Sequence, residues 1–142
     1  ENIPVGVMTE TAASGVMADL LESVVTVGTG KNAYTVGYRV AGKTGTTQNN
    51  SDGWFIGITP KLATAVWVGG ELRSIHFRSM ALGQGANAAL PIWALYMKKV
   101  YDDKTINFYK GDFNKPSVPL DVEMDCDKYQ EEIQVGNDYY SF

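Results

Sequence analysis

Two short apolar segments joined by a tight connection constrain the fold of this chain more than any other feature. Residues 54–59 and 62–68 are rich in β-branched and aromatic side chains, and only Pro60 and Lys61 separate them. Strands with so short a connection must be antiparallel neighbours, because a parallel pair needs a long crossover. The sequence therefore predicts a β-hairpin over residues 54–68.

A third strand is predicted just before this hairpin, over residues 34–46. Its first half alternates between apolar and polar positions, and the apolar ones are Tyr34, Val36, Tyr38 and Val40. Residues 48–53, Gln-Asn-Asn-Ser-Asp-Gly, are typical of a turn. The connection is again short, so the three strands are expected to form an antiparallel meander.

One helix is predicted on each side of the meander. Between residues 9 and 27 the apolar positions recur with the period of an amphipathic helix, and they are Val16, Met17, Leu20, Leu21, Val24 and Val25. Pro91 suits the first turn of a second helix that ends near residue 101, where a sheet face can be covered by Ile92, Trp93, Leu95, Tyr96 and Val100. Residues 71–87 are expected to be a loop. The predicted fold class is α+β: a three-strand antiparallel meander flanked by an N-terminal and a C-terminal helix that cover a sheet face.

Composition and charge suggest one globular module with an extension. The chain has 142 residues, of which 44% are hydrophobic and 20% are charged, as in an ordinary globular domain. Residues 1–101 carry eight Lys or Arg against six Asp or Glu, whereas residues 102–142 carry four against ten. We expect a compact module over 1–101 and an acidic extension over 102–142, in which the alternating residues 120–126 could add one strand. The chain begins at Glu1 and not at Met, so we expect it to be cut from a longer protein.

Several classes of function are disfavoured. Neither part of the chain has the basic patch of a nucleic-acid-binding protein. One His and one Cys are fewer than the ligands of a structural zinc site, and we expect neither a metal nor another cofactor. Cys126 lies between Asp125 and Asp127, which disfavour a thiolate, so an inert thiol is expected. No apolar run approaches the ~20 residues that cross a membrane.

The strongest candidate for a functional site is Lys43-Thr44-Gly45-Thr46, at the end of the predicted first strand. Side chains alternate along a strand, so Thr44 and Thr46 face one way while Lys43 and Gly45 face the other. All four can serve one site only along the strand edge, where a substrate backbone can pair as an extra strand. Two hydroxyls and an ammonium suit a carboxylate. The alternative is an ordinary edge strand with an exposed lysine and β-branched threonines.

The same region also satisfies a phosphate-binding pattern. Residues 37–44, Gly-Tyr-Arg-Val-Ala-Gly-Lys-Thr, match G-x-x-x-x-G-K-[ST]. A P-loop requires a helix to begin right after its lysine, so that backbone N–H groups face the phosphates. Here Gly-Thr-Thr-Gln-Asn-Asn follows at residues 45–50, which does not favour a helix. A nucleotide site is therefore kept only as a remote alternative.

Further segments share a characteristic order and spacing: Val-Gly-Thr-Gly at 27–30, Val-Ala-Gly-Lys-Thr-Gly-Thr-Thr at 40–47, Asp-Gly-Trp-Phe-Ile-Gly-Ile-Thr-Pro at 52–60, Ala-Val-Trp-Val-Gly at 65–69, Gly-Gln-Gly at 83–85 and Ala-Leu-Pro-Ile-Trp at 89–93. Together they resemble the class A (bifunctional) penicillin-binding proteins, in the C-terminal portion of the transpeptidase domain. The resemblance covers roughly residues 5–101 and, weakly, 116–129. It implies part of a β-lactamase/transpeptidase-like fold.

The resemblance also implies a reaction and roles for residues. In this family a serine attacks the D-Ala-D-Ala end of a peptidoglycan stem peptide, forms an acyl-enzyme and passes the acyl group to an amine of a neighbouring stem; β-lactam antibiotics acylate the same serine. The implied catalytic residues are Lys43, for charge stabilisation and proton transfer, and Thr46, whose backbone N–H would supply half of the oxyanion hole. The implied substrate-binding residues are Thr44, Gly45, Thr46 and Thr47, with the Thr44 and Thr46 hydroxyls on the terminal carboxylate of the stem peptide or the antibiotic.

The chain departs from the family pattern at the nucleophile, which lies in a Ser-x-x-Lys motif supported by Ser-x-Asn. No serine here has Lys three residues later or Asn two residues later. We expect both motifs upstream of Glu1, where another part of the same protein would complete the site, and no transpeptidase activity from this chain alone. The resemblance further implies an upstream glycosyltransferase domain and an upstream transmembrane anchor, with the protein extracytoplasmic, in the periplasm or on the outer face of the bacterial cytoplasmic membrane.

Other expectations remain open at this point. A non-catalytic, β-lactam-sensing relative with the same fold is the main alternative function. His76 lies in the predicted loop with no acid placed to orient it, so an exposed His is favoured over a general base. Core packing is favoured over a glycan platform for Trp54, Phe55, Trp67 and Trp93. The outer edge of the third strand, which the family pairs with a strand absent here, is expected to pair with residues 120–126 or with a second copy of the chain.

Overall fold

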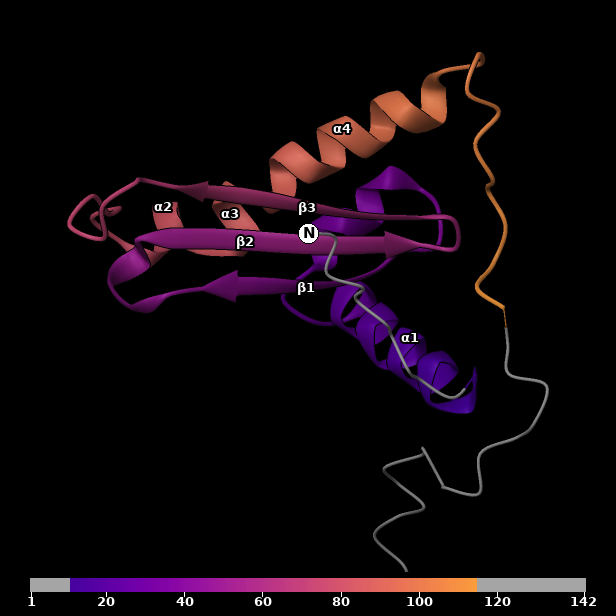
Figure 1. Cartoon of the computed structure of the whole chain (residues 1–142), viewed down its shortest axis with the longest axis horizontal. Coiled ribbons are helices and arrows are strands. Elements are labelled where there is room, and N and C mark those ends of the chain that lie inside the picture. Colours follow the sequence, from indigo (N-terminus) through magenta and orange to yellow (C-terminus); the bar gives the residue numbers. More distant parts are fainter. Residues whose placement is uncertain (1–10, 115–142) are drawn as a thin grey trace, which may run out of the picture.

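The computed structural model describes residues 11–114, whose helices and strands are arranged around a single sheet (Figure 1). In chain order they are α1 (Thr11–Thr26), the 3₁₀ helix η1 (Lys31–Val36), β1 (Ala41–Thr46), the 3₁₀ turn η2 (Gln48–Asn50), β2 (Asp52–Thr59), β3 (Leu62–Gly69), α2 (Met80–Gly83), α3 (Gly85–Ala88) and α4 (Leu90–Asp102).

The sheet is the predicted three-strand antiparallel meander, with strand order β1-β2-β3. In its register Lys43 pairs with Ile56 on β2, and Phe55 on β2 pairs with Val66 on β3. The tight connection between β2 and β3 lies between Thr59 and Leu62, which face each other. The α+β class and the antiparallel pairing predicted from the short connections are confirmed.

The predicted first strand is wrong in its first half. Residues Lys31–Val36 form η1, and β1 begins only at Ala41. Gly37, with φ of 79°, breaks the extended path. Three of the alternating apolar residues pack at the core instead: Val36 and Tyr38 are partly buried against it, and Val40 is buried. Tyr38 stacks on Tyr101 with ring centroids 4.0 Å apart.

The predicted loop over residues 71–87 contains two short helices, α2 and α3, which is a second correction. Each is four residues long, so neither carries the periodic signal by which a helix is predicted from sequence. The turn before β2 forms as predicted, and Asn49 and Asn50 adopt φ of 60° and 55°. Asparagine tolerates this left-handed region better than most residues.

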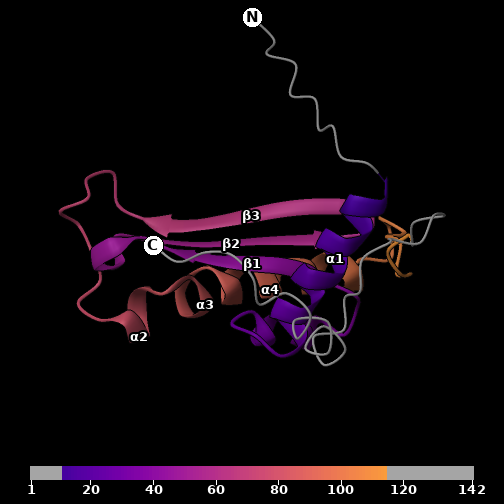
Figure 2. The ribbon, with the colours of Figure 1, turned by 90° about the horizontal axis from the view of Figure 1, so that it is seen from below.

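The core lies on one face of the sheet and is formed mainly by residues of β2, α4, η1 and the end of α1. Helices α2, α3 and α4 share this side of the sheet (Figure 2). Phe55 of β2 meets Trp93 of α4 edge to face, with ring centroids 5.1 Å apart, and both are fully buried. Gly57 makes this contact possible, because a Cβ there would overlap the Trp93 indole. Burial of both aromatics confirms the predicted core packing at these two positions.

The buried face of α4 differs from the predicted one. The structure buries Leu90, Trp93, Met97 and Tyr101, whereas Ile92, Leu95 and Tyr96 are exposed. Helical spacing explains the difference, because the buried residues follow one another at intervals of three and four once Leu90 starts the helix. Pro91 lies in the first turn, as predicted.

The opposite face of the sheet is open over β2 and β3 within the described residues. Trp54, Ile56 and Trp67 point there and are 41%, 46% and 47% exposed. Strand alternation places them on this face once Phe55 points into the core. The prediction that Trp54 and Trp67 pack in the core is therefore wrong; the two rings lie side by side on the surface, with centroids 6.2 Å apart.

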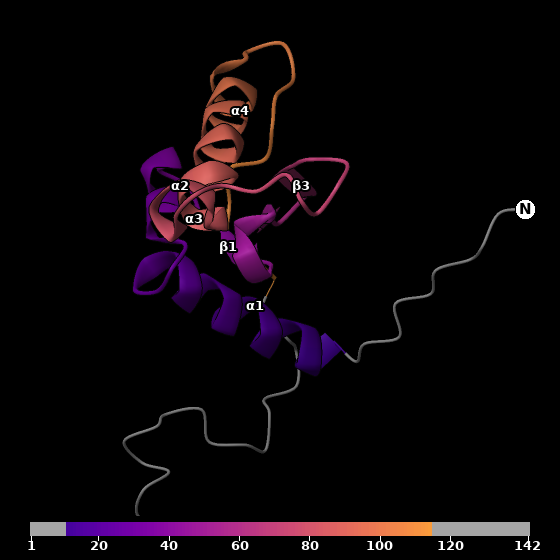
Figure 3. The ribbon, with the colours of Figure 1, turned by 90° about the vertical axis from the view of Figure 1, so that its left-hand side faces the viewer.

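Helix α1 packs mainly against β1 and η1, and Figure 3 shows it running beside the sheet. Of its predicted apolar face Val25 is fully buried, while Met17 and Leu20 are about half exposed. Arg39, between η1 and β1, links α1 to the segment after α4 through Glu22, at 3.0 Å, and Asp112, at 3.5 Å. In the part of the chain that the structure describes, no helix is both long and apolar enough to span a membrane.

Three expectations fall on residues 115–142, outside the described part of the chain. They are the strand over 120–126, the pairing of that segment with the edge of β3, and the inert thiol of Cys126. The division into a module over 1–101 and an acidic extension also stays a prediction.

Candidate carboxylate-binding edge

Candidate residues 43–46 lie on β1, which is an edge strand of the described sheet, and Thr47 follows directly after it. The connection after the strand shows which backbone groups face the open edge. Thr47 N–H donates to Asp52 O at 3.1 Å, toward β2. Hydrogen-bonding direction alternates along an antiparallel strand, so the N–H groups of Thr44 and Thr46 point away from β2. Where the motif lies, the edge therefore carries backbone donors that have no partner among residues 11–114.

Lys43 and the threonines occupy opposite faces at this edge. Lys43 is paired in register with Ile56, whose side chain lies on the open face. The Lys43 ammonium donates a hydrogen bond to the carbonyl of the next residue, Thr44, at 2.8 Å. Thr44 and Thr46 pair with Phe55 and Gly53, which point to the helix-covered face. Among the described residues the Lys43 ammonium has no carboxylate partner. Its charge is therefore available to an anion at the edge.

Each threonine hydroxyl of the motif is held by a different neighbour. Thr44 Oγ1 lies 2.9 Å from Thr29 Oγ1 in the turn after α1, and either hydroxyl can donate. Thr46 Oγ1 accepts a hydrogen bond from the N–H of Gly85 in α3, at 3.0 Å. The hydroxyl oxygens along β1 are thus fixed in place by groups far away in sequence.

Thr47 belongs to a hydrogen-bond cluster centred on the Asp52 carboxylate. Asp52 Oδ2 accepts from the hydroxyls of Thr47, at 2.9 Å, and Ser51, at 3.1 Å, while Oδ1 accepts from Trp67 Nε1 at 2.9 Å. These bonds favour the charged carboxylate, and the Trp67 bond contributes most to lowering the pKa of Asp52 below its usual value of 3.8. Asp52 thereby ties the end of β1 to β2 and β3.

Replacing Asp52 by Asn should flatten the acid dependence of stability. A carboxyl whose pKa is lower in the folded than in the unfolded state stabilises the protein at pH values above the unfolded pKa, which is 3.8 here. This stabilisation is lost as the pH falls from 3.8 through the lower pKa of the folded state. The wild-type chain should therefore lose more of its free energy of unfolding between pH 7 and pH 3 than Asp52→Asn, measured by urea denaturation. Asp102→Asn, which removes an exposed carboxylate on α4, is the matched control. Equal losses for wild type and Asp52→Asn would contradict this assignment.

Other residues singled out in the sequence do not join this edge. His76 lies in the loop after β3, where its Nδ1 is 3.1 Å from the Phe77 carbonyl and its side chain is exposed, as expected. The P-loop pattern ends within β1, so its Lys43 and Thr44 belong to a strand and not to a loop that opens a helix. The structure therefore lacks the backbone geometry by which a P-loop binds phosphate.

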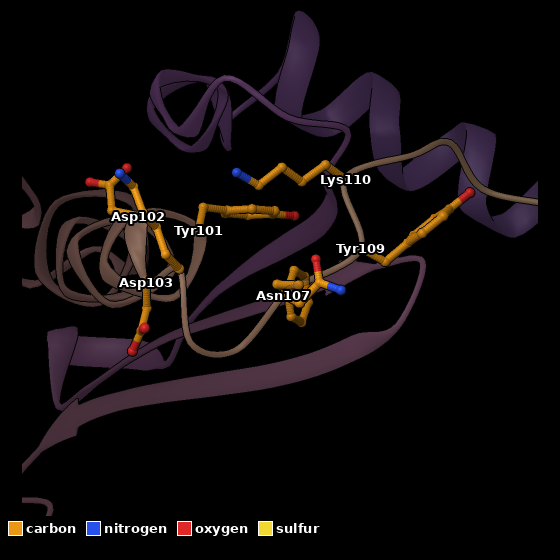
Figure 4. Close-up of a pocket in the computed structure, with 8 residues that line it drawn as sticks. Tyr101, Asp102, Asp103, Asn107, Tyr109 and Lys110 are labelled. Carbon is orange, nitrogen blue, oxygen red and sulfur yellow. The ribbon is translucent and has the colours of Figure 1, made fainter.

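A hollow of about 760 Å³ lies elsewhere, at the end of α4 (Figure 4). It is lined by Tyr101 and by residues 102–104 and 107–110, and the carboxylates of Asp102 and Asp103 share it with the ammonium of Lys110. Phe108 packs edge-on against Tyr101, with centroids 5.1 Å apart. None of residues 43–47 lines this hollow, so it is not part of the candidate edge.

Three residues at the edge were not predicted as functional: Thr29, Asp52 and Gly85. Thr29 and Gly85 contact the motif from 15 and 39 residues away in sequence, which no local pattern can show. Both lie in segments that contribute to the family resemblance, and that was the only available signal.

Comparison with known proteins identifies the family. The model of the penicillin binding protein transpeptidase domain matches residues 2–90, more than half of the chain. Penicillin-binding protein 1A of Aquifex aeolicus is 44% identical over 85 residues, which are 60% of this chain and 11% of that protein. Penicillin-binding protein 1A of Neisseria flavescens is 42% identical over 84 residues, which are 58% of this chain and 10% of that protein.

A solved structure gives the same result. Penicillin-binding protein 1A from Haemophilus influenzae superposes with a TM-score of 0.54 and 27% sequence identity, over 70% of this chain and 15% of that one. The chain spans about a tenth of the length of the relatives that it matches. It therefore belongs to the penicillin-binding protein transpeptidase family and corresponds to the C-terminal portion of the transpeptidase domain in class A members.

Proposed function

We propose that this chain forms the carboxylate-binding wall of a serine D,D-transpeptidase that cross-links peptidoglycan. The observation that carries the proposal is the Lys43–Thr46 segment on an edge strand of the described sheet, in a chain of the transpeptidase family. Its N–H groups point outward, and its ammonium has no carboxylate partner among residues 11–114. Such an edge can bind a peptide as an added strand. The ligand would be the D-Ala-D-Ala end of a stem peptide or a β-lactam.

The roles follow from the chemistry of the groups. The Lys43 ammonium would stabilise negative charge and assist proton transfer, and the Thr46 N–H would donate to the oxyanion. The hydroxyls of Thr44 and Thr46 would bind the carboxylate. Gly45 lacks a side chain that would obstruct a strand lying along the edge, and Thr47 would fix the end of the strand through Asp52.

The rest of the site would come from residues upstream in a longer protein. No serine of this chain lies in a Ser-x-x-Lys or Ser-x-Asn motif, so the nucleophile of the proposed reaction must be supplied there. The shares of 10% and 11% of the relatives' lengths are consistent with a larger protein. We further propose that this protein has a glycosyltransferase domain and a transmembrane anchor, and that this part of it is extracytoplasmic.

Labelling with a fluorescent penicillin, read by intact mass, tests the proposal. The longer protein should gain one covalent adduct and this chain alone should gain none, because the acylated serine lies upstream. Labelling of this chain alone would contradict the assignment of the nucleophile. Labelling of neither would contradict the transpeptidase and leave a non-catalytic relative of the same fold.

A further inference from the structure

The segment that joins α2 to α3 lies directly behind the end of β1. It consists of Gly83, Gln84 and Gly85, here called the glycine bracket. Figure 2 shows α2 and α3 on the helix-covered side of the sheet. The N–H of Gly85 reaches the strand from that side and donates to Thr46 Oγ1 at 3.0 Å. The bracket thus contacts the functional edge from the side opposite to its ligand.

Neither Gly83 nor Gly85 has room for a side chain. A Cβ on Gly85 would lie 2.5 Å from the carbonyl oxygen of Gly45 and closer still to that of Trp54, between the backbones of β1 and β2. A Cβ on Gly83 would lie 2.6 Å from Cβ of Asn50. Approaches this short do not occur for real side chains. The neighbours of Gly85 are backbone atoms of the two strands, which cannot move alone, whereas those of Gly83 are side-chain atoms of Asn50 and Phe77. An alanine at Gly85 would therefore displace the bracket or the strand.

The hydrogen bond from Gly85 determines what the Thr46 hydroxyl can do. A hydroxyl has one proton to donate and two lone pairs to accept with. Gly85 occupies a lone pair, and among the described residues no acceptor takes the Thr46 proton. The Thr46 side chain is exposed, so this proton remains available to a ligand at the edge. A carboxylate, which only accepts hydrogen bonds, is the matching ligand group.

We propose that the glycine bracket is a positioning element for carboxylate recognition, which fixes the Thr46 oxygen from behind and leaves its O–H directed to the ligand. This inference rests on the proposed function and adds to it a specificity device. Gly85 acts through Thr46 and does not touch the ligand. Its contribution should therefore depend on whether the ligand carries a carboxylate.

The test compares benzylpenicillin with its methyl ester, in which the carboxylate is masked. In the longer protein, Gly85→Ala should lower the second-order acylation constant for the free acid about tenfold or more, as expected for a lost hydrogen bond to a charged group. The constant for the ester should stay within about twofold, so the acid-to-ester ratio falls. Leu82→Ala, which changes an exposed residue of α2 outside the bracket, is the control and should keep both constants.

An equal loss for acid and ester, or an unchanged ratio, would overturn the inference, since a general distortion affects both ligands alike. A wild-type protein that no penicillin acylates would instead refute the proposed function. The hydrogen bond can then be tested in this chain by amide exchange at Gly85. Thr46→Val should accelerate that exchange and Thr46→Ser, which keeps the acceptor, should not. Unchanged exchange in Thr46→Val would show that the bracket does not hold Thr46.

Discussion

Replacing Lys43 by Met in the longer protein should slow acylation by benzylpenicillin about 10²–10³-fold. Methionine keeps an unbranched side chain one atom shorter than lysine and removes the charge. In the structure the Lys43 ammonium sits 2.8 Å from the Thr44 carbonyl, at the edge where the outward N–H groups lie. Acylation adds negative charge on the substrate carbonyl oxygen next to an existing carboxylate, so a fixed positive charge there stabilises the transition state more than the ground state. The measurement is the second-order acylation constant.

Position, and not charge alone, should produce this effect. Lys98→Met removes an exposed ammonium from α4 and is the matched control, for which we expect a change of less than about twofold because exposed charges are screened by solvent. Lys43→Arg should recover part of the rate, since the charge returns in a bulkier, planar group. A loss of less than threefold in Lys43→Met would contradict the role proposed for this lysine.

The sheet could be predicted from the sequence because its connections are short. The Pro60-Lys61 connection permits only antiparallel pairing, and the polar residues before β2 do the same for β1. The alternation at residues 34–40 predicts a strand, but contacts with α4 override it: η1 packs against α4, and Tyr38 stacks on Tyr101 from 63 positions away. The position of α4 likewise determines which face of β2 is buried. Trp93 of α4 packs against Phe55, so Trp54 lies on the opposite, exposed face.

The candidate edge could be predicted only in outline. Strand alternation correctly separates Lys43 and Gly45 from Thr44 and Thr46, because that property is local. The partners that hold the hydroxyls are non-local, and each comes from a different element: Thr29 after α1 and Gly85 in α3. A sequence pattern contains no information on such contacts unless the whole arrangement is already known. The functional roles of these residues remain proposals.

Replacing Trp93 by Ala should destabilise this chain by about 3–5 kcal/mol, which for a domain of this size is a large part of the total stability. The indole is fully buried between α4 and the sheet, edge to face with Phe55, and its Nε1 donates to Thr64 Oγ1 at 2.6 Å. The substitution leaves a cavity next to Gly57, which has no side chain to fill it, and takes away the donor to the Thr64 hydroxyl.

A matched substitution separates this effect from the loss of any tryptophan. Trp54→Ala also removes an indole, but from the open face of β2, where the ring is 41% exposed. It should therefore lower the free energy of unfolding much less than Trp93→Ala. The free energies of unfolding, measured by urea denaturation at pH 7, should therefore differ by at least about 2 kcal/mol between the two variants. Equal costs would mean that the open face carries as much of the stability as the core. The packing of α4 against β2 and β3 would then not be the main source of the stability of the sheet.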